Sequence, residues 1–397
     1  MISKLQPKRS VNTQCGFTLV ELMIAMVISL IILAGVVTVY SSSKRTHILQ
    51  KELATLQENA RYAFQSIAED IRGAGFGGCN PTINNMLDSS DPGYDSALFD
   101  FQAGIGGWEY VATPTSPGTD YTITSLTDTG VMGDWIGYDW DNDGAGDPLT
   151  PNLAGQAVQG NDVLVVKTSE TRDDLIPAGN TPANAATIVF TGQTNIEPGT
   201  IVIFSDCKKA DVFQNNSAAN SVNLTRPAAG TPGNVNPATS SFSHEYSTKA
   251  RIQVVRSHAY FVGNSVASGG PALFRADYSQ GSAGVVPEEL VEGVENMQIL
   301  YGEDLTPNDD NIRPDRYVTA DNITDPDNVI SIRISLLLRT PQELNHRTAN
   351  TRTFRLGGVD NATGVDVTTM SDRRIRKSYT TTIFMRNKGV FRERPGT

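Results

Sequence analysis

One carboxylate stands at the head of an apolar run that is long enough to cross a membrane. Glu21 directly precedes Leu22–Tyr40, which is almost purely apolar. A helix that spans a bilayer needs about 20 apolar residues. A charged group in such a segment is costly and marks a functional position. The run therefore predicts a membrane-length helix, and Glu21 predicts that a cationic partner is available to it, because buried charges are tolerated when they are paired.

Two simpler interpretations of this segment remain open. A secretory signal peptide would use Lys4, Lys8 and Arg9 as its charged region, but it needs a small-residue cleavage site after the apolar run, which residues 41–43 imitate poorly. It also leaves Glu21 unexplained. A plain membrane anchor needs only the length of the run, and the three basic residues of the leader favour a cytoplasmic N-terminus.

The helical pattern continues past the apolar run, without a proline, as far as Arg72. Apolar residues recur there at three- and four-residue steps, which is typical of a helix with one buried face. They are Leu49, Leu53, Leu56, Ala60, Phe64, Ile67 and Ile71. Four glycines between Gly73 and Gly78 then end the helix. A helix over Phe17–Arg72 is roughly 80 Å long. We expect its second part to pack on a globular head, with a free coiled coil as the alternative.

Short runs of β-branched residues follow the helix and alternate with loops of Gly, Pro, Asn, Asp and Ser. The predicted strands are Asp162–Thr168, Ala186–Thr191, Thr200–Ser205, Arg251–Val262, Ala272–Ala276, Met297–Tyr301, Val329–Leu338, Arg352–Leu356 and Ser378–Arg386. No helical pattern separates them, so we expect an α+β fold with an antiparallel sheet laid on the long helix and long loop insertions. Residues 80–161 form the larger insertion, and residues 215–243 are predicted to be an exposed, mobile loop.

Charge and motifs exclude several classes of function. The net charge of −11 argues against a general nucleic-acid binder. The sequence contains no G-x-S-x-G, H-E-x-x-H or P-loop motif and no other catalytic constellation, so we expect no enzyme. Basic residues gather near the C-terminus, where a solvated strand flank is the simplest interpretation. A docking face for an acidic neighbour is the alternative, and DNA uptake is a third. The basic residues are Arg373, Arg374, Arg376, Lys377, Arg386, Lys388, Arg392 and Arg394.

An acidic segment matches the first half of a calcium-binding loop. Asp139, Asp141 and Asp143 occupy alternate positions before Gly144, and Asp147 falls at the ninth place of the loop. The twelfth place holds Thr150 instead of the bidentate Glu of such loops. We interpret the segment as a solvated acidic turn. Calcium, held by the four aspartates, is the alternative and the one cofactor that the sequence suggests.

The N-terminal segment resembles the class III signal of type IV prepilins: a basic leader ending in Cys15-Gly16, then Phe17-Thr-Leu-Val-Glu21 and the apolar run. The resemblance implies cleavage after Gly16 by a prepilin peptidase, N-methylation of Phe17, and pairing of Glu21 with the terminal amine of an adjacent subunit. It implies a cleaved leader, a transmembrane and filament-core helix, an amphipathic helix and a periplasmic β-rich head, at residues 1–16, 17–40, 41–75 and 76–397. Losing the leader takes the net charge from −11 to −14.

Segments of the head resemble PilW-like minor pilins and, beyond them, the J-type minor pseudopilins of type II secretion. These segments are Arg72–Cys79, Glu289–Gly302, Val329–Arg339 and Phe384–Asn387. The resemblance implies a non-enzymatic minor pilin, first in the inner membrane and then in the extracellular pilus, which primes assembly and sits at or near the tip. The implied partners are the prepilin peptidase, other minor pilins, the major pilin and a tip adhesin. A minor pseudopilin and a membrane-anchored adhesin or binding module are the alternatives.

Two cysteines remain once Cys15 has left with the leader. Cys79 and Cys207 would lie in the periplasm, where an isolated pair is typical of one disulfide. Two free buried thiols are the alternative, because the sequence does not show that the two residues are adjacent. A metal site is not expected, because the four histidines have no ligand spacing with the cysteines or with one another.

Overall fold

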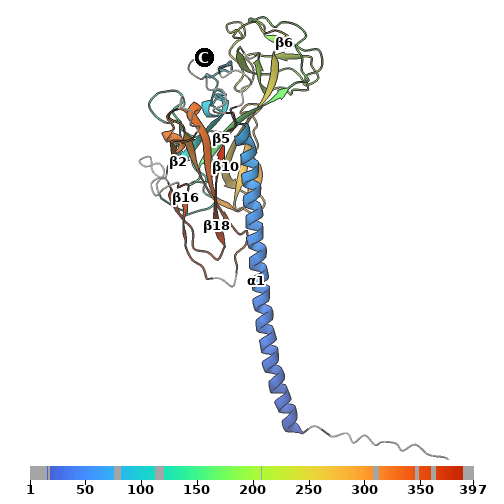
Figure 1. Ribbon diagram of the computed structural model, residues 1–397, viewed down its shortest axis with the longest axis vertical. Coiled ribbons are helices and arrows are strands. Elements are labelled where there is room, and N and C mark those ends of the chain that lie inside the picture. The colour runs from blue at the N-terminus through green and yellow to red at the C-terminus, as the bar shows by residue number, and fades with distance from the viewer. Residues whose placement is uncertain are drawn as a thin grey trace, which may run out of the picture. The chain divides into compact units, whose positions relative to one another are not determined.

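The computed structural model describes residues 16, 18–75, 82–111, 120–206, 208–306, 313–344, 348–358 and 364–387. The chain divides into two units, Met1–Ala54 and Thr55–Thr397. Helix α1 (Leu19–Gly73) runs across the boundary, and the described strands all belong to the second unit. The predicted α+β class is confirmed, with one long N-terminal helix and a head of several β-sheets (Figure 1).

Helix α1 has two parts with different side chains. Its large apolar residues between positions 19 and 40 are exposed. Its second part buries one face of small and aliphatic side chains, which are Leu56, Ala60, Ala63, Ile67, Ala68 and Ile71. The predicted stripe is thus confirmed for the helical part that belongs to the head. In Figure 1 this part runs beside β5 (Val163–Arg172) and β10 (Arg251–Asn264).

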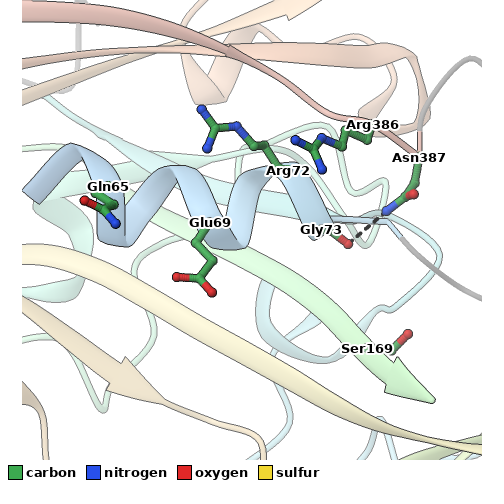
Figure 2. Close-up of a pocket in the computed structure, with 7 residues that line it drawn as sticks. All are labelled: Gln65, Glu69, Arg72, Gly73, Ser169, Arg386 and Asn387. Carbon is green, nitrogen blue, oxygen red and sulfur yellow. Dashed lines mark hydrogen bonds between the residues drawn. The ribbon is translucent and has the colours of Figure 1, made fainter.

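The end of α1 lies where the glycines predict it. Gly75 has a φ of 71°, a left-handed conformation that a residue with a Cβ rarely adopts. The side-chain amide of Asn387 donates to the carbonyl oxygens of Gly73 and Ala74 at 3.1 and 3.2 Å (Figure 2). The backbone N–H of Arg386 donates to the carbonyl oxygen of Arg72 at 3.4 Å. The C-terminal segment therefore satisfies the free carbonyl groups of the last helical turn.

The largest sheet of the described chain has nine strands. Seven follow the order β1-β8-β7-β10-β5-β2-β4, and β11 and β12 are attached beyond β10. The bounds of those not yet given are β1 (Ile83–Asn85), β2 (Ile105–Tyr110), β4 (Trp135–Gly137), β7 (Ile201–Ser205), β8 (Ala210–Gln214), β11 (Pro271–Asp277) and β12 (Glu288–Glu292). The strand β10 is central because it pairs with β5, β7 and β11, all antiparallel.

A second sheet has the order β14-β13-β15-β18 and is antiparallel throughout. Its strands are β13 (Val294–Glu303), β14 (Arg316–Val318), β15 (Val329–Arg339) and β18 (Arg376–Phe384). Two small sheets complete the described head: β16 (Thr353–Leu356), β17 (Val365–Thr368) and β3 (Tyr121–Thr122), and β6 (Thr187–Val189) with β9 (Asn223–Thr225). The short helical segments are α2 (Ser96–Phe99), η1 (Met132–Asp134), η2 (Ala320–Asn322) and η3 (Pro326–Asn328).

Each of the nine predicted strands is present, but the single antiparallel sheet that we expected is wrong in detail. The strands form several sheets, and β1–β8 and β17–β3 are parallel pairs. The insertion over residues 80–161 belongs to the core, because its strands β2 and β4 extend the largest sheet. The physical reason is the pair of buried tryptophans that it carries, Trp108 and Trp135.

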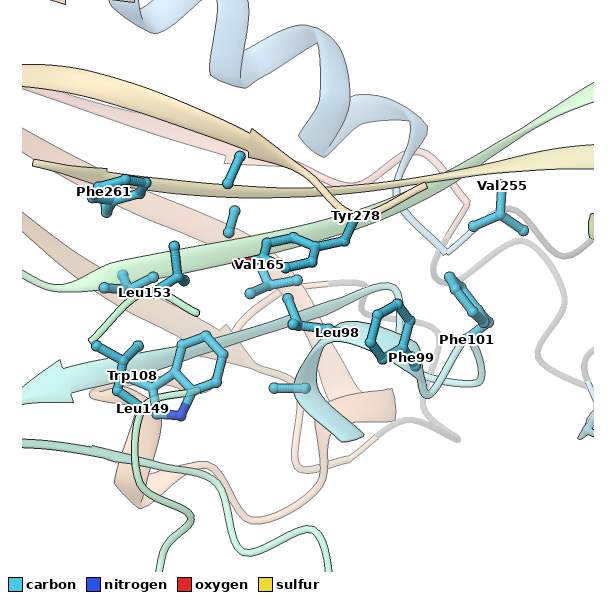
Figure 3. Packing of buried hydrophobic residues seen from close by; sticks show 14 of the residues in the cluster. Leu98, Phe99, Phe101, Trp108, Leu149, Leu153, Val165, Val255, Phe261 and Tyr278 are labelled. Carbon is cyan, nitrogen blue, oxygen red and sulfur yellow. The ribbon is translucent and has the colours of Figure 1, made fainter. Parts of the chain in front are cut away.

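The main core cluster packs against the largest sheet. Figure 3 shows Trp108 close to Leu149 and Leu153, and Phe99 beside Phe101 and Tyr278. The ring centroids of Phe99 and Tyr278 are 6.4 Å apart in an edge-to-face arrangement. The indole N–H of Trp108 donates to the carbonyl oxygen of Pro148 at 3.0 Å, so its polar atom is satisfied inside the core.

A second core cluster lies under β6 and β9 and corrects the prediction for residues 215–243. That segment is not an exposed loop, since Leu224 and Phe242 are buried in this cluster. Three of its polar residues, Asn215, Arg226 and Asn234, are buried too, and the amide of Asn234 exchanges hydrogen bonds with the backbone of Gln214 at 2.7 and 2.9 Å. Polar composition predicts exposure only when the side chains have no partners inside the fold.

Candidate functional site

The first turn of α1 is closed by reciprocal hydrogen bonds between Thr18 and Glu21. The backbone N–H and the hydroxyl of Thr18 donate to Oε2 of Glu21 at 3.0 and 2.9 Å. The backbone N–H of Glu21 donates to the Thr18 hydroxyl oxygen at 3.2 Å. This arrangement is a capping box, which satisfies free N–H groups at a helix N-terminus. The charge of Glu21 also suits the positive end of the helix dipole.

The cap gives Glu21 a role that the prediction of a cationic partner did not take into account. The Thr18-x-x-Glu21 spacing is the sequence signal for it. A carboxylate accepts several hydrogen bonds, so capping leaves capacity for a second partner. Pairing with the amine of an adjacent subunit stays a prediction. Gly16 is exposed, and Phe17 lies outside the described residues.

Helix α1 is long and apolar enough to span a membrane, by length and composition. Its most apolar window of 18 residues has a mean hydropathy of 2.9, and none of that window is buried. Among the described residues no second helix meets the same measure. An N-terminal helix of this kind fits membrane anchoring of the chain.

The acidic loop brings three of its four aspartates together. Carboxylate oxygens of Asp139, Asp141 and Asp147 lie within 4.8 Å of one another. Asp143 does not join this group, and its Oδ1 accepts a hydrogen bond from the backbone N–H of Ala145 at 2.8 Å. Burial raises the pKa of Asp147, and the negative charges of the other three aspartates raise it further.

Backbone N–H groups already donate hydrogen bonds to several carboxylate oxygens of this loop. The N–H of Asp143 donates to Asp139 and Asp141, and the N–H of Gly144 donates to the second oxygen of Asp139 at 2.9 Å. Thr150, at the place of the bidentate Glu, is buried. Such hydrogen bonds are typical of turns rich in aspartate, whether or not a cation binds.

The predicted disulfide between Cys79 and Cys207 stays a prediction, because both residues lie outside the described residues.

A polar cluster that the sequence gave no reason to expect joins α1 to β10. Oδ2 of Asp70 accepts hydrogen bonds from Nδ1 of His258 and from the hydroxyl of Tyr260, each at 2.6 Å. Burial alone would raise the pKa of Asp70, but His258, through its hydrogen bond and charge, and Tyr260 hold that pKa below its ordinary value. Nε2 of His258 lies 3.7 Å from the carboxylate of Asp277 on the other side.

A pocket of about 650 Å³ lies at the end of α1, lined by Gln65, Glu69, Arg72, Gly73, Ser169, Arg386 and Asn387 (Figure 2). Arg72 and Arg386 extend on one side of the helix, and Glu69 points to the other side. The hydroxyl of Ser169 donates to the side-chain oxygen of Gln253 at 2.7 Å. The described lining contains no histidine or cysteine.

Two family models match the chain, one at each end. The model of the type IV pilus-assembly protein W matches residues 259–387, from β10 to β18 and Asn387. The model of the prokaryotic N-terminal methylation motif matches residues 11–37, which include Gly16, Phe17 and Glu21. None of the curated proteins compared with the chain matches it. Three head segments that resemble PilW-like proteins lie within the first match, and Arg72–Cys79 lies outside it. In the two regions that these models cover, the chain is similar to PilW-like type IV pilins.

Proposed function

We propose that this chain is a minor pilin that primes assembly of a type IV pilus and stays at or near the pilus tip. The observation that carries the proposal is the presence, in one chain, of a prepilin-type N-terminus and a PilW-like head segment. The N-terminal motif supplies the means to enter a filament. The head segment distinguishes this chain from other proteins that share the motif.

The proposed course begins in the inner membrane, where α1 anchors the chain and the head is periplasmic. The prepilin peptidase cuts after Gly16, and Phe17 is methylated. Helix α1 then joins the helical core of the filament, where Glu21 neutralises the amine of an adjacent subunit; a charge buried among apolar helices needs such a partner. The head reaches the cell exterior with the pilus, in which we propose roles in adhesion and twitching motility.

The size of the head supports a position at the end of the filament. The strands β2, β4, β7 and β8 lie outside the segment that the PilW model matches, yet they share one sheet with β10 and β11. A head enlarged in this way suits one place at the filament end better than regular repetition along it. The partners we propose are the prepilin peptidase, other minor pilins, the major pilin and a tip adhesin, with no catalytic role.

Deletion and replacement of the gene test the proposal. We expect deletion to reduce the number of surface pili per cell and the wild-type chain to restore it. A Gly16→Val chain should not restore it, because the peptidase must accept the residue before the cut. In the folded chain, a Cβ at Gly16 meets no described atom within 4 Å, so this variant tests processing rather than folding.

Two other results would contradict the proposal. Normal piliation of the deletion strain with loss of type II secretion would identify a minor pseudopilin. If piliation and secretion are both normal in the deletion strain, a membrane-anchored adhesin remains as the alternative. Its test is whether cells that carry the Gly16→Val chain still bind the target surface of the adhesin.

A further inference from the structure

The last strand of the head has a long edge with no neighbouring strand among the described residues. In the described part of the chain, β18 is terminal in its sheet and pairs only with β15, over nine consecutive residue pairs without a bulge. Along such an edge, alternate residues direct their backbone N–H and C=O groups away from the sheet. A second strand can therefore add to this edge.

The other sheet edges of the described head are blunted. The terminal strands β1, β3, β4, β6, β9, β14 and β16 have four residues or fewer. The terminal strand β12 carries Glu288, Glu289 and Glu292, and its pairing with β11 contains a bulge. Short length, charge and bulges are the means by which proteins prevent unwanted edge pairing. β18 uses none of them between Ser378 and Phe384.

The composition of β18 favours strand pairing. The stretch Ser378–Phe384 contains Tyr, three Thr, Ile and Phe, all of which have high β propensity, and no charge or proline. Ser378 and Thr380 are exposed, and Phe384 is 51% exposed at the end of the strand. An exposed edge with an apolar end is what β-augmentation uses, since backbone hydrogen bonds give affinity and side chains give specificity.

The start of β18 is held rigidly. The guanidinium group of Arg376 makes two hydrogen bonds to the Glu295 carboxylate, at 2.6 and 2.9 Å, and two to Asp372, at 2.6 and 2.8 Å. Arg376 and Glu295 are both buried. The edge is therefore ordered before a partner arrives, which lowers the entropic cost of binding.

Cations stand at both ends of the exposed stretch, although the chain as a whole is acidic. Lys377 is exposed at its start. Arg386 follows its end by two residues and lies on the same side of the helix end as Arg72 (Figure 2). These charges favour a partner segment with carboxylates near both of its ends.

We propose that β18 receives an extended segment of a neighbouring pilin subunit, which adds a strand to the sheet and places carboxylates against Lys377 at one end and Arg72 and Arg386 at the other. The inference rests on the proposed function, since the filament supplies the partner. Beyond that function, the inference names β18 as the element that contacts the neighbouring subunit and specifies an extended, carboxylate-flanked segment as its partner.

Crosslinking in piliated cells tests the contact. A photo-reactive amino acid is placed at Phe384 in the full chain, and control chains carry it at Val266 or Val286, which are 98% and 85% exposed in the same head. We expect an adduct at Phe384 whose second component, identified by mass spectrometry, is another chain with a prepilin-type N-terminus. No adduct above the control level, an adduct with a second copy of this chain, or an adduct with a protein that is not a pilin would overturn the inference.

A paired variant separates strand addition from a general loss of the head. Ser378→Lys with Phe384→Lys adds two charges to the edge, and Val266→Lys with Val286→Lys adds two charges elsewhere. Both chains should melt as the wild type does, and the edge variant alone should reduce recovery of the pilin partner at least tenfold. Equal recovery from both would contradict strand addition.

Amide hydrogen exchange measures strand addition to β18 directly. In a complex of the full chain with the crosslinked pilin, amides of β18 should exchange at least tenfold more slowly than in the free chain, and those of the β16 edge should not change. Unchanged exchange in β18 would exclude an added strand. If the wild-type chain is absent from pili altogether, it is the proposed function that fails, whereas a chain present in pili with an unprotected β18 refutes this inference alone.

Discussion

Nδ1 of His258 lies 2.6 Å from Oδ2 of Asp70, and this contact joins β10 to the part of α1 that belongs to the head. A carboxylate only accepts hydrogen bonds, so Nδ1 carries the proton. About three turns earlier in the same helix, the side-chain amide of Asn59 donates to the carbonyl oxygen of Glu292 at 3.2 Å. The helix is thus held on the head by directed polar contacts as well as by its apolar face.

Asp70→Asn should lower the free energy of unfolding of the full-length chain by roughly 2–4 kcal/mol, because His258 and Tyr260 lose a charged acceptor in a buried site. Glu69→Gln, one residue away on an exposed position of the same helix, is the matched control and should change it by less than about 0.5 kcal/mol. Urea titration in detergent measures both. An equal loss in the two variants would show that the buried cluster contributes nothing specific.

The same carboxylate makes stability depend on acid pH. The pKa of Asp70 is lower in the folded chain than in the unfolded chain, so its contribution is complete above about pH 4 and is lost as the pH falls through the folded value. Between about pH 4 and pH 2 the wild-type chain should lose more stability than Asp70→Asn. Parallel pH profiles of the two proteins would contradict this assignment.

A second buried carboxyl group, that of Asp162, makes stability change with pH in the opposite direction. Asp162 accepts hydrogen bonds from the backbone N–H of Ile299 at 2.7 Å and of Tyr110 at 3.3 Å, and so bridges two sheets. Burial raises the pKa of Asp162 to about 7, and Glu109 is hydrogen-bonded to it. The folded chain therefore holds an extra proton between about pH 4 and pH 7, and the contribution of this pair to stability falls as the pH rises through that range.

Glu109→Gln isolates this pair. The amide N–H of Gln can replace the carboxyl proton as donor to Asp162 and removes the second negative charge, so the decline in melting temperature between pH 4 and pH 7 should become shallower. Tyr301 and Asp321, the other titratable groups near Asp162, are unchanged in this variant. A slope equal to that of the wild type would show that the two carboxyl groups are not coupled.

Two substitutions of Glu21 separate helix capping from charge. Glu21→Ala removes both, whereas Glu21→Gln keeps an oxygen that accepts from Thr18 and loses only the charge. Both should leave cleavage intact, and Glu21→Ala should ease membrane insertion by roughly 2–3 kcal/mol. We expect both to impair incorporation into pili, measured by immunoblot of sheared pili. Normal incorporation of Glu21→Gln would show that the cap, and not the charge, is what the filament requires.

The acidic loop gives a calcium test. We expect several millimolar calcium to leave the melting temperature unchanged, because Asp143 does not join the other three aspartates and Thr150 replaces the bidentate Glu. A rise that disappears in Asp141→Asn with Asp143→Asn would instead establish a calcium site, since an ion bound only by the folded chain stabilises it. Such a site would have a dissociation constant of about 0.1–1 mM.

Local patterns in the sequence predicted the long helix and nine of the eighteen described strands. The helix ends one residue from the predicted Arg72, because glycines act on the backbone directly. These nine strands of the head could be predicted because β-branched runs between turn residues have few other conformations. The Thr18 and Glu21 cap was equally local and was available from their spacing.

Contacts between distant residues could not be predicted in the same way. Asp70 and His258 are separated by 188 positions, and Arg376 and Glu295 by 81. Arg376 belongs to the basic run that we expected to be solvated, yet it is buried because Glu295 and Asp372 neutralise it. Composition gives the charge of a segment, whereas burial depends on which partner the fold brings to it.

Mass spectrometry of sheared, purified pili shows whether this chain enters the filament in its processed form. We expect this chain to be present at low abundance and its N-terminal peptide to begin at N-methyl-Phe17, followed by Thr18, Leu19, Val20 and Glu21. Absence of the chain from pili that contain the other pilins, or a chain that begins at Met1 or after residue 43, would contradict this expectation.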